Sequence, residues 1–180
     1  MGRRFAHAAL GAVPALLAGL WLGAQAGPAR AQNVPQCRAD RVIVKQADRL
    51  SQFRVEIADT EGERAQGLMG RESLPKSAGM LFVYPDAREV SFWMHNTPLP
   101  LDILYIDAAG RVAKIAREAT PFDETPLPSG APVQYVLEIN GGLSDLLGLS
   151  EGAVVAYPGS RKNCRNLRTK ISAAFSRIRA

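Results

Sequence analysis

The stretch FWMHNTPLPLDILYID, residues Phe92–Asp107, holds two strand-like segments on either side of a turn at Asn96–Thr97. Pro98 and Pro100 follow the turn, and because proline has no backbone N–H it does not fit the middle of a hydrogen-bonded ladder. The stretch therefore predicts an edge, a bulge or a crossing rather than two neighbouring central strands. Leu101–Ile106 alternates again after the prolines, which is typical of a strand.

The same alternation recurs along most of the chain and predicts short strands. The strand-like segments are Arg41–Lys45, Phe53–Ala58, Met80–Tyr84, Val90–His95, Leu101–Ile106, Val112–Arg117, Val133–Ile139 and Ala153–Tyr157. Turn signals separate them, the longest being the proline-rich segment Thr120–Pro132. Together they predict a mainly β (α+β) fold: a small, mostly antiparallel β-barrel or sandwich.

Two short internal helices fit the remaining pattern. The first is expected within TEGERAQGLMG, Thr60–Gly70, where Thr60 and Glu63 make a capping box. The second runs from about Leu143 to Leu147 and is closed by Gly148.

Residues 1–31 are typical of a secretory signal peptide. Arg3 and Arg4 precede an apolar run, and an Ala-Arg-Ala triplet ends the segment at Ala31. The apolar run is shorter than the roughly 20 residues that a membrane-spanning helix needs, and Pro14 interrupts it. We expect cleavage after Ala31, a periplasmic or secreted protein, and a single β-rich domain over residues 32–160.

The net charge of +5 is unevenly distributed. Residues 1–31 hold three arginines and no acid, so the rest of the chain has a net charge of +2. Residues 161–180 hold seven basic residues and no acid, so residues 32–160 have a net charge of 2 − 7 = −5. A basic tail on a mildly acidic domain is not the pattern of a nucleic-acid-binding protein. A C-terminal amphipathic helix is predicted by apolar residues at helical spacing, namely Leu167, Ile171, Phe175 and Ile178. This helix either docks on the domain or makes weak contact with an anionic membrane.

Two cysteines follow the leader, Cys37 and Cys164. An even number of cysteines in an exported protein indicates a disulfide, which here would join the two ends of the domain. Free thiols and a metal site are the alternatives, and the lack of a Cys-x-x-Cys spacing weakens both redox and zinc chemistry.

Side chains alternate between the two faces of a strand, and this alternation, here called strand parity, singles out Asp102. It shares a face with Leu104 and Ile106, where an unpaired carboxylate would be costly, so a partner is required. We expect that partner to be the Asn96 turn or an arginine, and Arg64 and Arg71 are the favoured arginines.

The polar residues near this turn support two interpretations. One is a pocket for a small polar or anionic ligand, formed by Arg64, Arg71, Trp93, His95, Asn96, Thr97 and Asp102. The other is an internal network of arginine and aspartate that pins the first helix to the sheet. Ligand or partner binding without catalysis is the favoured function, in a monomer without cofactor.

Two other functions stay open. An envelope enzyme would use Asp102 or Glu63 as its acid or base, although capping already explains Glu63. A soft-metal protein handling copper would use Met69, Met80, Met94 and His95. Methionines at strand and helix positions are more often part of the core.

The motifs ERAQGLMGR (Glu63–Arg71), GMLFVY (Gly79–Tyr84), FWMHNTPLPLDILYID, VLEINGG and GLSEGAVV closely resemble the domain of unknown function 192 family over roughly residues 40–157. The resemblance implies a small β-rich domain, frequently exported, without an established activity. It supports as motif positions Arg64, Gly67, Met69, Arg71, Trp93, Met94, Asn96, Thr97, Pro100 and Asp102. His95 stands where a lysine is common, and Ala153 stands where an acidic residue often follows the glycine.

Overall fold

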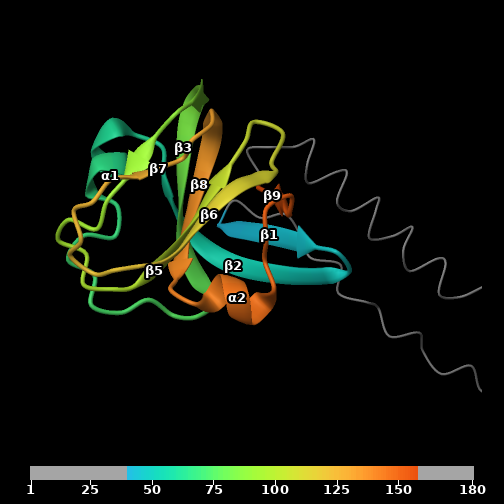
Figure 1. Cartoon of the computed structure of the whole chain (residues 1–180), viewed down its shortest axis with the longest axis horizontal. Helices are drawn as coiled ribbons and strands as arrows, with labels where there is room; N and C mark the ends of the chain where they lie inside the picture. The colour runs from blue at the N-terminus through green and yellow to red at the C-terminus, as the bar shows by residue number, and fades with distance from the viewer. Residues whose placement is uncertain (1–39, 158–180) are drawn as a thin grey trace, which may run out of the picture. The chain divides into compact units, whose positions relative to one another are not determined.

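The structure is a computed structural model that describes residues 40–157 (Figure 1). The strands are β1 Arg41–Gln46, β2 Arg49–Ala58, β3 Ala78–Arg88, β4 Ser91–Phe92, β5 Leu101–Ile106, β6 Val112–Ala119, β7 Leu127–Pro128, β8 Val133–Asn140 and β9 Val154–Ala156. The helices are α1 Glu61–Gln66 and α2 Leu143–Leu147. The expected leader, both cysteines and the basic tail lie outside the described residues.

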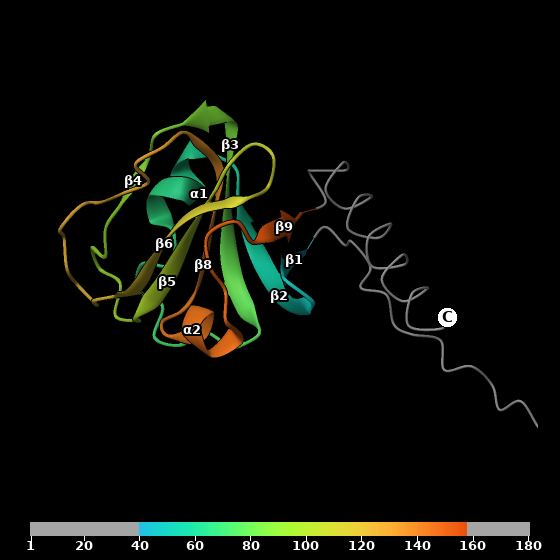
Figure 2. The same ribbon diagram turned by 45° about the vertical axis from the view of Figure 1, so that its right-hand side comes forward.

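One curled seven-stranded sheet organises the domain, in the order β6-β5-β8-β3-β2-β1-β9 (Figure 2). Neighbouring strands are antiparallel except β2 and β3, which are parallel and are joined through α1. The two edges of the sheet meet, because Arg111 before β6 pairs with Val154 of β9 and the Val112 N–H donates to the Ala153 carbonyl at 2.9 Å. The result is a partly closed barrel, with β4 and β7 as a separate two-stranded ribbon.

Apolar side chains form a layer on each face of the sheet. The inner layer includes Val44, Phe53, Leu104, Ile106 and Leu137. The outer layer lies beneath α1 and the segment after it, and includes Leu68, Phe82, Met94, Ile103 and Tyr105. Every residue of β5 is buried because this strand lies between the two layers.

The predicted fold class is confirmed at this level: a mainly β domain with two short helices and a curled sheet. The capping box of Thr60 and Glu63 is present, but α1 ends at Gln66 with Gly67 as its C-cap. The strand predicted over Val90–His95 is wrong in length, since only Ser91–Phe92 pairs with another strand. Among residues 40–157, no helix has the length and apolar character needed to cross a membrane.

The turn in the opening stretch carries the chain from the β4–β7 ribbon into the main sheet, so of the three predicted arrangements, an edge, a bulge or a crossing, it is a crossing. Asn96 has a φ of 50°, and the Thr97 N–H donates to the Met94 carbonyl at 3.1 Å. The Asn96 carbonyl accepts from the Gly70 N–H at 2.8 Å, so the turn is tied to the segment that follows α1. This link positions Trp93 and Thr97 beside the helix.

Candidate functional site

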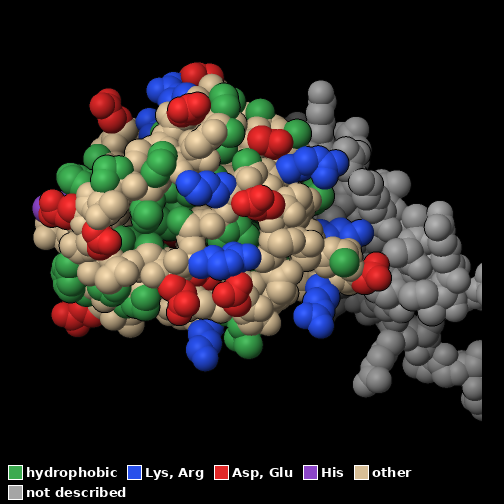
Figure 3. Space-filling model, in the orientation of Figure 1, with side chains coloured by type: hydrophobic (Ala, Val, Ile, Leu, Met, Phe, Trp, Pro, Cys, Tyr) green, Lys and Arg blue, Asp and Glu red, His purple; other side chains and the backbone are tan. Residues whose placement is uncertain are grey.

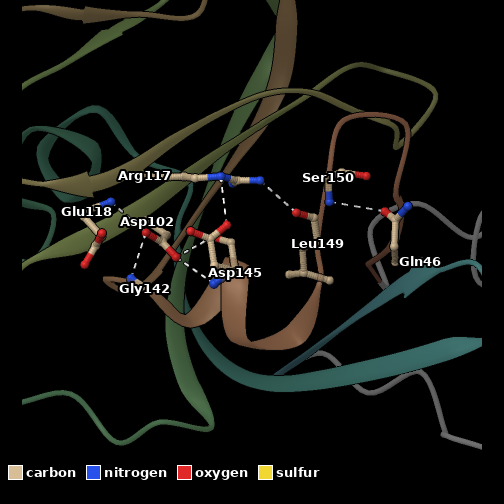
Figure 4. A network of polar contacts seen from close by, with 9 residues as sticks. Gln46, Asp102, Arg117, Glu118, Gly142, Asp145, Leu149 and Ser150 are labelled. Carbon is tan, nitrogen blue, oxygen red and sulfur yellow. Dashed lines mark hydrogen bonds and ion pairs between the residues drawn. The ribbon is translucent and has the colours of Figure 1, made fainter.

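Asp102 is fully buried, with an exposed fraction of 0%, and its partners are internal (Figure 4). Oδ1 accepts from the backbone N–H groups of Glu118 at 2.8 Å and Gly142 at 3.1 Å. Oδ2 accepts from the Ser144 N–H at 2.7 Å and from the Ser144 hydroxyl. The carboxyl group therefore fixes the start of α2 to the sheet.

The partner expected for Asp102 was wrong. Parity correctly placed the side chain in the interior and required hydrogen bonds, but neither an arginine nor the Asn96 turn supplies them. Because its hydrogen-bond donors enclose the carboxyl group, Asp102 serves neither as a ligand contact nor as a catalytic acid or base.

The two arginines of the predicted pocket lie apart from Asp102. Arg71 pairs with Glu56 on β2, with 2.6 Å between Nη2 and Oε2. Arg64 Nη1 donates to the carbonyls of Asp59 at 2.5 Å and Val83 at 3.0 Å. The Arg64 guanidinium also lies over the Tyr84 ring, 5.1 Å from its centroid, which places this cation against β3.

A hollow of about 230 Å³, here called the α1 pocket, lies between α1 and the outer face of the sheet. Its lining consists of residues 64–69, Phe82, Tyr84, Ser91, Phe92, Trp93, Thr97 and Glu138. Three residues of the predicted site are therefore brought together here: Arg64, Trp93 and Thr97. The Thr97 side chain is oriented by its hydroxyl, which donates to the His95 carbonyl at 3.0 Å.

Trp93 is 49% exposed, although tryptophan is a large apolar residue. His95 stacks on it, with 5.0 Å between ring centroids and an angle of 24° between the planes. The His95 ring is held by Glu124, 2.5 Å from Nδ1, and by the Asn96 amide, 2.9 Å from Nε2. The indole is therefore supported by a hydrogen-bonded ring and remains accessible beside the α1 pocket.

Asn96 lies in a neighbouring hollow of about 540 Å³, shared with Gln66, Met69 and Pro98. Phe122 also lines this hollow and is exposed. The seven predicted ligand-binding residues thus separate into the α1 pocket, its rim at His95, the hollow at Asn96, the surface pair at Arg71 and the interior at Asp102.

Glu138 is the functional candidate that sequence reasoning missed. It lies on β8, lines the α1 pocket and is only 5% exposed. Within residues 40–157, no hydrogen-bond partner is found for its carboxyl group, and Oε2 is completely enclosed. Burial raises the pKa of Glu138 from its ordinary value of 4.5 to about 8, so the group is mostly protonated at neutral pH.

Aromatic residues line the pocket or pack against its lining. Phe82 and Phe92 meet edge to face with centroids 4.9 Å apart, and Phe92 meets Tyr105 in the same way at 6.0 Å. The Tyr105 hydroxyl donates to the Leu127 carbonyl at 2.5 Å, so it is not directed at Glu138 as a donor. An unpaired acid among aromatic rings is the chemical signature of this site.

The other predicted functional residues have structural explanations. The Glu63 carboxylate accepts from the Thr60 N–H at 3.0 Å, and these hydrogen bonds lower the pKa of Glu63, which suits a cap and not a general acid. Met80 and Met94 lie in the outer apolar layer, so the arrangement gives the copper hypothesis no support. Among the residues described, no cluster of three or more His, Cys, Asp or Glu side chains has a metal-binding arrangement.

Comparison with known proteins agrees with this fold. The domain of unknown function DUF192, described as "Uncharacterized ACR, COG1430", matches residues 42–157. A crystal structure of a protein of unknown function from Novosphingobium aromaticivorans DSM 12444 is 44% identical, with a TM-score of 0.64, covering 65% of this chain and 84% of that one.

A second crystal structure, from Sinorhizobium meliloti 1021, is of a protein named as a candidate transcription regulator. It is 40% identical, with a TM-score of 0.63, covering 64% of this chain and 91% of that one. A comparison with curated proteins gave no match. The family match spans nearly the whole sheet, α1 and Glu138, and the chain therefore belongs to the DUF192 family of uncharacterised domains.

Proposed function

We propose that this chain is a non-catalytic binding domain that takes a small polar ligand in the α1 pocket. The observation that carries the proposal is Glu138, a buried carboxyl group that lines the pocket without a hydrogen-bond partner among the described residues. A buried polar group of this kind is costly to folding, and a ligand that supplies the missing hydrogen bond offsets the cost. Arg64 and the exposed face of Trp93 add a charged and a stacking contact.

Export belongs to the proposal and rests on the leader-like residues 1–31. DNA binding, which the Sinorhizobium protein's description raises, is not favoured. Residues 40–157 hold eleven basic and seventeen acidic residues, a net charge of −6. Figure 3 shows the two signs interspersed over one face and no basic stripe, whereas affinity for DNA depends on clustered cations at the phosphates.

A ligand screen tests the proposal on the full chain. Small amino acids, amines, sugars and organic acids are added at millimolar concentration, and the melting temperature and the indole N–H signal of Trp93 are recorded. We expect at least one compound to raise the melting temperature and to shift both the Trp93 indole and the Thr97 amide signals.

Two exposed aromatic residues give a matched pair of variants. Trp93→Ala removes the stacking face of the α1 pocket and should weaken binding about tenfold, whereas Phe122→Ala alters only the neighbouring hollow and should leave affinity unchanged. The proposal fails if no compound binds, or if signals move only around Phe122.

An acid–base enzyme is the second candidate, because a carboxyl group with a raised pKa in a pocket is typical of catalytic sites. Glu138 would take the role first expected of Asp102 or Glu63. Prolonged incubation with the bound compound separates the two functions: the proposal predicts recovery of the unchanged ligand, and product formation that Glu138→Gln abolishes would establish the enzyme.

A further inference from the structure

We propose that the ligand of the α1 pocket is a small zwitterion whose ammonium group pairs with Glu138 and whose carboxylate pairs with Arg64. This inference rests on the proposed function of the pocket and names the chemistry of its ligand. It predicts a short amino acid or a similar molecule with one charge at each end.

The side of the pocket formed by Glu138 favours a cation. Glu138 has no hydrogen-bond donor within residues 40–157 and lies with Phe82, Phe92 and Tyr84 in the lining. An ammonium group supplies three donors to a carboxylate, and aromatic rings attract cations through their π faces. A neutral polar group satisfies the hydrogen bonds but gains nothing from the charge of the carboxylate.

Among residues 40–157, no side chain supplies this cation. Arg64 lines the same pocket, but its Nη1 atom is bonded to the Asp59 and Val83 carbonyls and its guanidinium lies over Tyr84. Burial is the only cause found for the raised pKa of Glu138, so Arg64 does not compensate the carboxylate. An internal salt bridge between the two residues is therefore absent from the described domain.

The same arrangement leaves Arg64 available for an anion. Within the described residues, hydrogen bonds are found only for its Nη1 atom, so Nε and Nη2 remain as donors. A guanidinium edge matches a carboxylate in geometry and charge. One anion site and one cation site in a single pocket of about 230 Å³ suit a zwitterion of roughly eight water-sized groups.

Binding is coupled to proton release. The neutral Glu138 acid loses its proton to the solvent and the resulting carboxylate pairs with the incoming ammonium group, which keeps all of its own protons. The ionisable groups around Glu138 are Tyr84 on β3, Tyr105 on β5 and Arg64 on α1. Burial raises the pKa values of both tyrosines, so they remain neutral across the pH range in which Glu138 titrates.

The probes are glycine, β-alanine, 4-aminobutanoate and 5-aminopentanoate, which place the two charges at increasing separations. Propylamine and butanoate serve as controls that carry only one of the charges, and glycerol serves as a neutral control. Isothermal titration calorimetry of the full chain in two buffers of different ionisation enthalpy gives both affinity and proton release. We expect one zwitterion to bind at least tenfold more tightly than either single-charge control and to release about one proton at pH 6.5.

The pH dependence adds a second readout with a defined sign. Since Glu138 must ionise before it pairs, affinity should rise about tenfold per pH unit up to about pH 8 and then level off. Glu138→Gln should remove this dependence and weaken binding at least tenfold, whereas Glu151→Gln, the same change in an exposed turn, should alter neither.

The outcomes separate the two proposals. If glycerol or sugars bind at the pocket as tightly as the best zwitterion, or if affinity falls with rising pH, the zwitterion inference is wrong and the binding function stands. If no probe or screened compound affects the pocket, the proposed function itself is wrong. Arg64→Lys, which keeps the charge but loses the paired donors, should weaken the zwitterion and leave propylamine unchanged.

Discussion

Asp102 and Glu138 are buried carboxyl groups on neighbouring strands that face opposite sides of one sheet. Residues Ile103 and Glu138 are paired in the register of β5 and β8, so the two acids lie close in the fold. Asp102 accepts four hydrogen bonds and closes the barrel end at α2. Glu138 has no partner in the described domain and borders a cavity. Burial therefore does not by itself distinguish a structural acid from a functional one, whereas hydrogen-bond satisfaction does.

Removing the carboxyl group of Asp102 should destabilise the domain most. Asp102→Ala leaves the N–H groups of Glu118, Gly142 and Ser144 without their acceptor and should lower the free energy of unfolding by about 3–5 kcal/mol. Urea denaturation measures the loss. Ser144→Ala, which removes only one of the four donors, should cost about 1 kcal/mol. A loss below about 1 kcal/mol for Asp102→Ala would show that these hydrogen bonds do not hold α2.

The unsatisfied acid should behave in the opposite way. Between its ordinary pKa of 4.5 and its raised pKa of about 8, Glu138 binds more proton in the folded than in the unfolded chain, so its contribution to stability falls as pH rises. Relative to Glu138→Gln, the native protein should lose about 1.4 kcal/mol per pH unit in this window. Denaturation series at several pH values test this, with Glu151→Gln as the control. Parallel curves for the native protein and Glu138→Gln would contradict it.

The position of Glu138 depends on the close approach of β3 to β8. A Cβ atom at Gly79 would lie 2.4 Å from the Glu138 carbonyl oxygen, and this contact is with backbone that cannot rotate away. Gly79→Ala should therefore destabilise the domain by about 2 kcal/mol. Gly62→Ala is the matched control, since its Cβ meets nothing within 4 Å and alanine favours the helix. Equal stabilities of the two variants would show that β3 moves away from β8 without cost.

The smallest loss of stability is expected from removing the cap of α1, and it should be confined to the side of the sheet that carries the α1 pocket. Thr60 caps α1 through the Glu63 N–H at 3.3 Å, and Thr60→Ala should cost about 1 kcal/mol. Hydrogen exchange should become faster at the first amides of α1 and stay unchanged at Ser144, beside Asp102. Faster exchange at both places would mean that the two regions unfold together.

The local sequence pattern was sufficient to predict most of the fold. Leu101–Ile106 has the predicted bounds, and its alternate residues divide between the two apolar layers as parity requires. The helix Leu143–Leu147 and its closing Gly148 also agree, because a left-handed C-cap at φ 65° is what glycine allows. The parallel pairing of β2 with β3 and the ribbon of β4 with β7 depend on tertiary contacts that local pattern does not contain.

The site was less predictable for a physical reason. Parity places Asp102 in the interior but cannot identify donors 40 and 42 residues away in the α2 turn. The same parity argument, applied to Glu138 beside Val136, would have marked a second acid on an apolar face. Whether such an acid is satisfied depends on the packing of α1 over the sheet, which the sequence pattern does not determine.

Titration of Glu138 itself is the most direct measurement. The full chain, labelled with ¹³C at glutamate carboxyl carbons and assigned with Glu138→Gln, is titrated by NMR with and without saturating 4-aminobutanoate. We predict a midpoint near pH 8 for Glu138 in the free protein and a midpoint at least one pH unit lower with ligand bound. A free midpoint near the ordinary value of 4.5 would contradict the claim that Glu138 is an unpaired acid reserved for a ligand.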